Sequence, residues 1–298
     1  MDYQTFTMEL ADLVNRELGS EHMARICRIP KNNGIVRESM TVKGETGEAV
    51  PLVDLGQFYH LYQQGEAMEN LAGRIIGNCK GRKMQMLGDG SFFSDFEKAR
   101  EHICFRVVNL EKNLELLSQI PYRMVLDLAV VYYYRFENFD SSQASILIYK
   151  EHMEAWGVEE EELWRIARDN SEERLSPQLV TLRQLVLDLC DEEDSLHLPE
   201  LSPEDEMFVL SNRERYFGAA VLFYDEIPEK LGEALKNNFY ILPSSIHECI
   251  IVPDSGLISP FKLRNMVKEV NEMCVVPEEV LSDQVYYFER KKGVLSIA

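Results

Sequence analysis

Short apolar runs rich in β-branched and aromatic residues recur along this sequence, and brief polar turns separate neighbouring runs. Lys31-Asn32-Asn33-Gly34 joins two such runs, and its Asn-Gly pair supplies the positive φ angles of a tight hairpin turn. "RMVLDLAVVYYYRF" at 123–136 predicts the central strand, and "ASILIY" at 144–149 is expected to pair with it. Strands that pair with their sequence neighbours, instead of alternating with helices one for one, indicate an α+β fold. We therefore expect a mostly antiparallel sheet flanked by helices.

The remaining elements follow from the period of the apolar residues. Further strands are expected at 102–110, 207–212, 216–224, 239–242, 247–253 and 284–288. Helices are expected at 3–17, 67–80, 157–171, 176–190, 227–237 and from Ser259-Pro260 onward. In the helix predicted at 176–190, Ser176 is the N-cap and Pro177 the first helical residue. The helix after Pro260 has one apolar face, made of Leu263, Met266, Val267, Val270 and Met273.

Two glycines and an aspartate in "GDGSF" at 88–92 interrupt the helical period and mark the best domain boundary. The chain is accordingly divided into a small αββα-like module at 1–95 and a larger α+β domain at 96–298. Within the larger domain, "DEEDSLHLPELSPEDE" at 191–206 reads as a solvated acidic loop.

Composition restricts the classes of partner. The net charge of −20, from 51 acidic and 31 basic residues, repels phosphate backbones, so no nucleic-acid partner is expected. No apolar run is long enough to cross a bilayer, and the N-terminus lacks the pattern of a secretion signal, so we expect a cytoplasmic protein without a membrane partner. The six cysteines are scattered singly, which favours buried reduced thiols over a disulfide framework or a zinc site.

Residue types used in catalysis gather in one stretch, "FYILPSSIHECIIVPDS" at 239–255. Pro243 cannot donate a ladder hydrogen bond, so a strand is expected to end there and the serines to form a turn. If the following run is extended, Ser245 and His247 share one face and Glu248 takes the other. The stretch has no glycine for a hydrolase elbow, which favours a structural role. As a candidate binding cluster it comprises Ser244, Ser245, His247, Glu248 and Asp254.

Metal and cofactor motifs are not found in the sequence. His247-Glu248 lacks the second histidine of a zinc protease, because Ile251 occupies that position. "GDG" at 88–90 has neither the lysine of a phosphate-binding loop nor a third glycine in register. We therefore expect no metal and no cofactor. The run Tyr132-Tyr133-Tyr134 is expected to pack in the core, since consecutive strand residues alternate between faces.

Several blocks together resemble an uncharacterised bacterial family, the domain-of-unknown-function family 5688. They are "KNNG", "VVNLEKNLELLSQIPYRMVLDLAVVYYY", "WGVEEEELWRIARDNS", "FYILPSSIHECIIVP" and "MVKEVNEM" followed by "VPEEVLSDQVYYF". The resemblance spans nearly the whole chain, and "LPSSIHE" and "LSDQVYYF" are specific to that family. It implies a cytoplasmic bacterial protein and brings no catalytic residue, cofactor or partner.

Two functions from different classes follow. The preferred hypothesis is a noncatalytic binding or interaction protein whose partner is an unknown protein or small molecule and whose oligomeric state is open. The alternative is a hydrolase-like enzyme that uses Ser244 or Ser245 with His247 and an acid, either Glu248 or Asp254. The distance from the serine hydroxyls to the His247 ring nitrogens discriminates between them.

Overall fold

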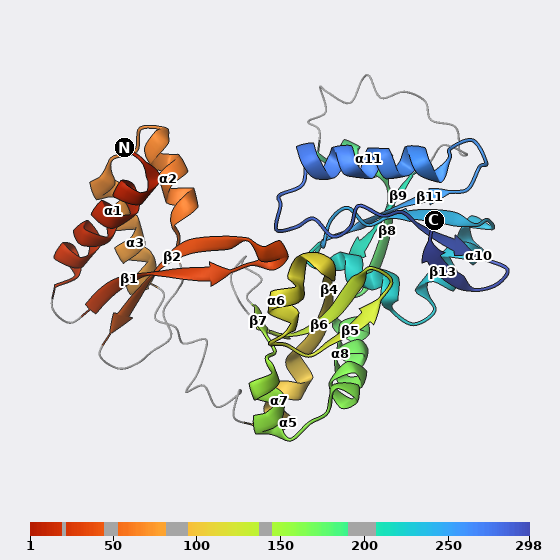
Figure 1. Ribbon diagram of the computed structural model, residues 1–298, viewed down its shortest axis with the longest axis horizontal. Coiled ribbons are helices and arrows are strands. Elements are labelled where there is room, and N and C mark those ends of the chain that lie inside the picture. Colours follow the sequence, from red (N-terminus) through yellow and green to blue (C-terminus); the bar gives the residue numbers. More distant parts are fainter. Residues whose placement is uncertain (20–21, 45–52, 82–94, 137–144, 190–206) are drawn as a thin grey trace. The chain divides into compact units, whose positions relative to one another are not determined.

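The computed structural model describes residues 1–19, 22–44, 53–81, 95–136, 145–189 and 207–298. It divides into two compact units, Met1–Phe92 and Phe93–Ala298 (Figure 1). The glycine-rich boundary predicted at 88–92 and the acidic loop predicted at 191–206 lie outside the described residues.

The first unit packs helices on a small antiparallel sheet of order β1-β2-β3. Its elements are α1 (Tyr3–Leu18), β1 (His22–Pro30), η1 (Asn32–Gly34), β2 (Val36–Gly44), β3 (Val53–Asp54), α2 (Leu55–Gln63) and α3 (Met68–Gly81). The predicted hairpin is confirmed, because Pro30 pairs with Val36 and both Asn33 and Gly34 have positive φ. The helices predicted at 3–17 and 67–80 are confirmed, whereas α2 had no predicted counterpart. Phe6, Leu10, Met40, Leu55, Leu71 and Ile75 form the centre of its core.

The second unit contains two antiparallel sheets with helices packed on them. The first has the order β4-β6-β5, with β7 also paired to β6. Its strands are β4 (Ile103–Asn109), β5 (Tyr122–Val125), β6 (Leu128–Arg135) and β7 (Ser145–Leu147). The short helices beside it are α5 (Phe96–Ala99), η2 (Arg100–His102), η3 (Glu111–Asn113), α6 (Leu114–Leu117) and α7 (Lys150–Trp156). Helix α8 (Glu160–Arg174) packs along β4 and β6 (Figure 1). Its Trp164 ring contacts Phe105 of β4.

The second sheet has the order β13-β12-β10-β11-β9-β8. Its strands are β8 (Pro177–Thr181), β9 (Phe208–Asn212), β10 (Phe239–Leu242), β11 (Cys249–Pro253), β12 (Tyr286–Glu289) and β13 (Val294–Ile297). Its helices are α9 (Leu182–Leu189), η5 (Gly218–Phe223), α10 (Ile227–Leu235) and α11 (Pro260–Met273), and α11 lies along one face in Figure 1. Every described strand pair is antiparallel, so the predicted α+β class is confirmed.

The strand predicted at 123–136 is wrong in extent, because it is a hairpin of β5 and β6. Val125 pairs with Leu128, which leaves Leu126 and Asp127 as the turn, and Leu126 takes a positive φ of 54°. The apolar residues on both sides hide this turn in the sequence. The expected pairing of 144–149 with the central strand is confirmed by β7, whose Leu147 pairs with Tyr133.

The helix predicted at 176–190 begins too early. Pro177–Thr181 forms strand β8, and α9 begins at Leu182, where the Thr181 hydroxyl accepts a hydrogen bond from the Gln184 N–H at 3.0 Å. Strand β8 is an edge strand that pairs with β9. A proline that suits the first turn of a helix also suits the first residue of an edge strand, because neither position needs its missing donor.

The strand predicted at 216–224 is wrong, because residues 218–223 form the 3-10 helix η5. Both edges of β9 are occupied, by β8 on one side and β11 on the other, so this segment cannot pair with β9 as a further strand. Its backbone bonds instead run locally, from the Ala220 N–H to the Phe217 carbonyl at 3.2 Å. A short buried apolar run has the same pattern in either conformation.

The apolar face predicted for α11 is covered in part. Leu263 and Val267 are buried against Leu242, Val252 and Val285 of the sheet region. Met273, at 82% exposure, is open to solvent. The residues that point at the sheet therefore form a narrower row than the predicted face.

Candidate functional site

The two serines of the predicted cluster lie in the turn between β10 and β11. Both side chains are buried. The Ser245 hydroxyl accepts a hydrogen bond from the backbone N–H of His247 at 3.0 Å, and Ser245 forms an isolated bridge with Val280. The Ser244 carbonyl accepts from the Leu281 N–H at 3.0 Å. These bonds fix a tight turn, which is a common use of serine.

His247 is held by the segment that precedes η5. Its Nδ1 accepts a hydrogen bond from the Phe217 N–H at 3.3 Å, which assigns the ring proton to Nε2. Nε2 lies 3.5 Å from Glu279 Oε1. The imidazole also stacks on the Phe217 ring, with centroids 5.9 Å apart and an interplanar angle of 6°. In the described part of the chain, neither serine hydroxyl is hydrogen-bonded to this ring.

The two candidate acids have different surroundings. Glu248 is half-buried beside His247, and burial raises the pKa of its carboxyl, as does the charge of Glu279, while His247 and Arg215 lower it. Asp254 lies beyond the far end of the five-residue strand β11, which spans about 16 Å. There it accepts a hydrogen bond from the Tyr287 hydroxyl at 2.9 Å. The structure thus brings Ser244, Ser245, His247 and Glu248 together and places Asp254 elsewhere.

Arg106 on β4 lies over the Phe217 ring and was not predicted as a site residue. Its guanidinium carbon is 4.4 Å from the centroid of Phe217. The side chain is half-buried, and its Nε is enclosed without a hydrogen-bond partner. Burial lowers the pKa of the guanidinium, and the groups that oppose this shift are the phenols of Tyr216, Tyr133 and Tyr149. The signal in the sequence is a single charged residue within the apolar strand "ICFRVVN".

The aromatic residues around Arg106 are held in a strained backbone. Arg215 and Phe217 have φ of 51° and 53°, a left-handed conformation that costs about 1–3 kcal/mol at a residue other than glycine. The buried Asn212 amide stabilises the bend, because it donates to the Tyr216 carbonyl at 2.8 Å and accepts from the Tyr216 N–H at 3.2 Å. Strain of this kind, kept by a dedicated side chain, is frequent at binding and catalytic sites.

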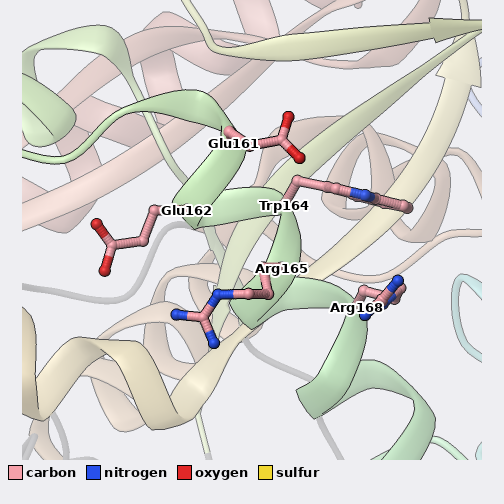
Figure 2. A pocket seen from close by; sticks show the side chains of 5 residues that line it. All are labelled: Glu161, Glu162, Trp164, Arg165 and Arg168. Carbon is pink, nitrogen blue, oxygen red and sulfur yellow. The ribbon is translucent and has the colours of Figure 1, made fainter.

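A separate groove of about 500 Å³ lies on α8 and is lined by Glu161, Glu162, Trp164, Arg165 and Arg168 (Figure 2). All five side chains come from one helix, so this is a surface groove. Its charges are largely compensated. Glu161 is paired with Arg123, and Arg168 lies 3.2 Å from both Asp169 and Asp225. This balance of charge gives the groove no preference for an ion of either sign.

Two general properties hold for the described residues. No group of three or more histidine, cysteine or acidic side chains is arranged to hold a metal ion there. Within the same residues, no helix has the length and apolar character needed to span a bilayer.

Comparison with known proteins gives a match to a protein family. No curated protein and no solved structure is detectably similar to this chain. The model of the Family of unknown function (DUF5688) matches residues 3–290, nearly the whole chain. That span includes the 243–248 turn, the aromatic residues around Arg106 and the groove on α8. The chain therefore belongs to the Family of unknown function (DUF5688).

Proposed function

We propose that the protein is a noncatalytic binding or interaction protein of the bacterial cytoplasm. The observation that carries this proposal is how the 243–248 turn uses its reactive groups. The Ser245 hydroxyl accepts from the His247 backbone, and His247 Nδ1 accepts from the Phe217 backbone. A serine nucleophile needs a base that takes its proton and an acid that orients the base. Here the Ser245 oxygen and His247 Nδ1 each accept a hydrogen bond from a backbone N–H, so both atoms stabilise the fold.

The net charge supports the proposed class of partner, and the cysteines support the proposed compartment. A net charge of −20 disfavours nucleic acid, so a protein or a small molecule is the better partner class. Cys104 and Cys249 are buried free thiols, as predicted, whereas Cys27 is half-buried and Cys274 is exposed. Free thiols are expected in a reducing compartment. The resemblance to a bacterial family supports the bacterial origin.

Turnover assays on the full chain test this function. Wild type, Ser245→Ala and His247→Asn are compared on p-nitrophenyl esters and on a chromogenic amide. Ser255→Ala is the matched control, because the exposed Ser255 hydroxyl accepts a turn hydrogen bond from the Leu257 N–H at 3.4 Å. We expect no turnover above background in any variant. Turnover by the wild type that survives Ser255→Ala and is lost in both other variants would establish the hydrolase alternative.

A further inference from the structure

Arg106 differs from the other charged side chains of its sheet because no carboxylate among the described residues compensates it. Arg123 on β5, by contrast, lies 2.9 Å from Glu160 Oε2, and its hydrogen bonds to Glu160 and Glu161 raise its pKa. In the part of the chain that the structure describes, Arg106 makes no ion pair and no hydrogen bond, and its Nε is enclosed. A half-buried guanidinium without a described counter-charge is a favourable place for an anion, because a bound anion would pair with it.

The phenols beside Arg106 add neutral donors. Tyr133 is 1% exposed, and its hydroxyl has no hydrogen-bond partner among the described residues. Burial raises its pKa well above the ordinary value, so this hydroxyl keeps its proton at neutral pH and can donate. Tyr216 is half-buried, and its hydroxyl also lacks a hydrogen-bond partner in the described chain. Arg106 and the rings of Tyr133 and Tyr216 all contact Phe217, so a cation and two O–H donors without a described acceptor surround the same ring.

The Phe217 ring determines how a ligand reaches the guanidinium. A ring that covers one face of the guanidinium leaves the in-plane N–H donors of its two Nη atoms available, since only Nε is enclosed. Those donors form a planar fork, which matches the two oxygens of a carboxylate. The surroundings favour a single negative charge, because Glu279 lies 3.5 Å from His247 and His247 stacks on the same Phe217 ring.

We propose that Arg106 binds the carboxylate of a small-molecule ligand, with the hydroxyls of Tyr133 and Tyr216 as further donors. This inference rests on the proposed binding function and specifies its ligand class. It assigns the 243–248 turn a supporting role, in which His247 holds the Phe217 ring in place.

Titrations of the full chain test the proposal. Sodium acetate, sodium benzoate and sodium phosphate are added at constant ionic strength, and binding is followed by the arginine Nε–Hε resonances in NMR spectra and by calorimetry. We expect one arginine resonance to shift saturably with both carboxylates. Arg106→Met should abolish that shift and weaken binding by about 10–100-fold, the loss expected for hydrogen bonds to a charged group. Tyr133→Phe should weaken binding by about 5-fold, the loss of one neutral hydrogen bond.

Controls separate the site from general charge effects. Arg183→Met removes an exposed arginine on α9 and should leave the titrations unchanged. Arg106→Lys keeps the charge without the fork and should bind carboxylates more weakly than wild type while folding normally. An equal response in wild type and Arg106→Met, or no response to either carboxylate, overturns the site. Tighter binding of phosphate than of both carboxylates overturns the ligand class. None of these outcomes bears on turnover, which the ester and amide assays measure separately.

Discussion

Gly218 lies so close to His247 that a Cβ atom on Gly218 would come within 2.5 Å of the His247 carbonyl oxygen. The same atom would lie 2.1 Å from Ser211 Oγ, which donates a hydrogen bond to that carbonyl at 2.7 Å. The close approach also lets the Ala219 N–H donate to the Ile246 carbonyl at 3.3 Å. Gly218 therefore joins the 243–248 turn to β9 and to the start of η5.

Substitution of Gly218 by alanine is expected to destabilise the protein. The methyl group overlaps backbone atoms that cannot move without breaking the Ser211–His247 contact, and overpacking of this kind costs about 1–3 kcal/mol in the free energy of unfolding. Gly73→Ala is the control, because a Cβ at Gly73 in α3 meets nothing within 4 Å and alanine favours a helix. Urea unfolding measures both. A Gly218→Ala protein as stable as wild type would contradict the tight packing of this junction.

Removal of the Arg106 charge is expected to stabilise the free protein. Replacement of buried charged groups by apolar residues of similar volume is neutral or raises the free energy of unfolding by about 1–4 kcal/mol, and the half-buried Arg106, without a carboxylate partner in the described chain, should lie at the low end of that range. Urea unfolding of Arg106→Met in anion-poor buffer measures the change. Arg165→Met, at an exposed position, should stay within about 0.5 kcal/mol of wild type. A large loss of stability in Arg106→Met would mean that its contact with Phe217 outweighs the cost of burial.

The Asp127 carboxylate links the two sheets of the second unit. It accepts hydrogen bonds from the hydroxyls of Ser282 and Tyr286, which lie more than 150 residues later in the sequence. The Ser282 hydroxyl also accepts from the Gln284 N–H at 2.9 Å, and Asn109 donates to the Leu281 carbonyl at 3.0 Å. Residues 281–286 are thus tied to the β5–β6 turn and to the end of β4.

Tyr286→Phe is expected to lower the free energy of unfolding by about 1.5–3 kcal/mol, because it removes a hydrogen bond to a charged group in a buried setting. Tyr122→Phe is the matched control, since the Tyr122 ring is exposed and the structure gives its hydroxyl no hydrogen bond. Guanidinium unfolding followed by circular dichroism compares the two. Equal stability of both variants would show that the Asp127 contact contributes little to joining the sheets.

Local signals in the sequence were sufficient for much of the fold. The Asn-Gly hairpin and the helix that begins after Ser259 were predictable because a short segment contains all that determines them. Pro177 and the run at 216–224 were misassigned because their conformations depend on which edges of β9 are free. That information is tertiary and is not present in either segment.

In the candidate site, too, local features were predictable from the sequence and tertiary contacts were not. The turn at Pro243 was predictable, as was the gathering of serines around it. The contact between Arg106 and Phe217 joins positions 111 residues apart and depends on the left-handed bend before η5. A single arginine in an apolar strand predicts a carboxylate partner elsewhere in the chain. Only the folded arrangement shows that no described carboxylate pairs with Arg106.

The raised pKa of Glu248 predicts a pH dependence of stability. Burial disfavours its ionised form, so the folded-state pKa lies above the ordinary value of 4.5. Well below pH 4.5 the carboxyl is protonated in both states and carries no penalty. As the pH rises from 4.5 through the folded-state pKa, the unfolded state releases its proton first, so this group lowers the free energy of unfolding. Glu248→Gln should therefore be more stable than wild type at pH 7, with a difference that grows over that interval and is constant above it.

Urea unfolding between pH 4 and pH 8 measures the difference in the free energy of unfolding, and Glu272→Gln on the exposed side of α11 should follow wild type throughout. A Glu248→Gln difference that does not change with pH would mean that hydrogen bonding at this position, and not burial of charge, decides its stability.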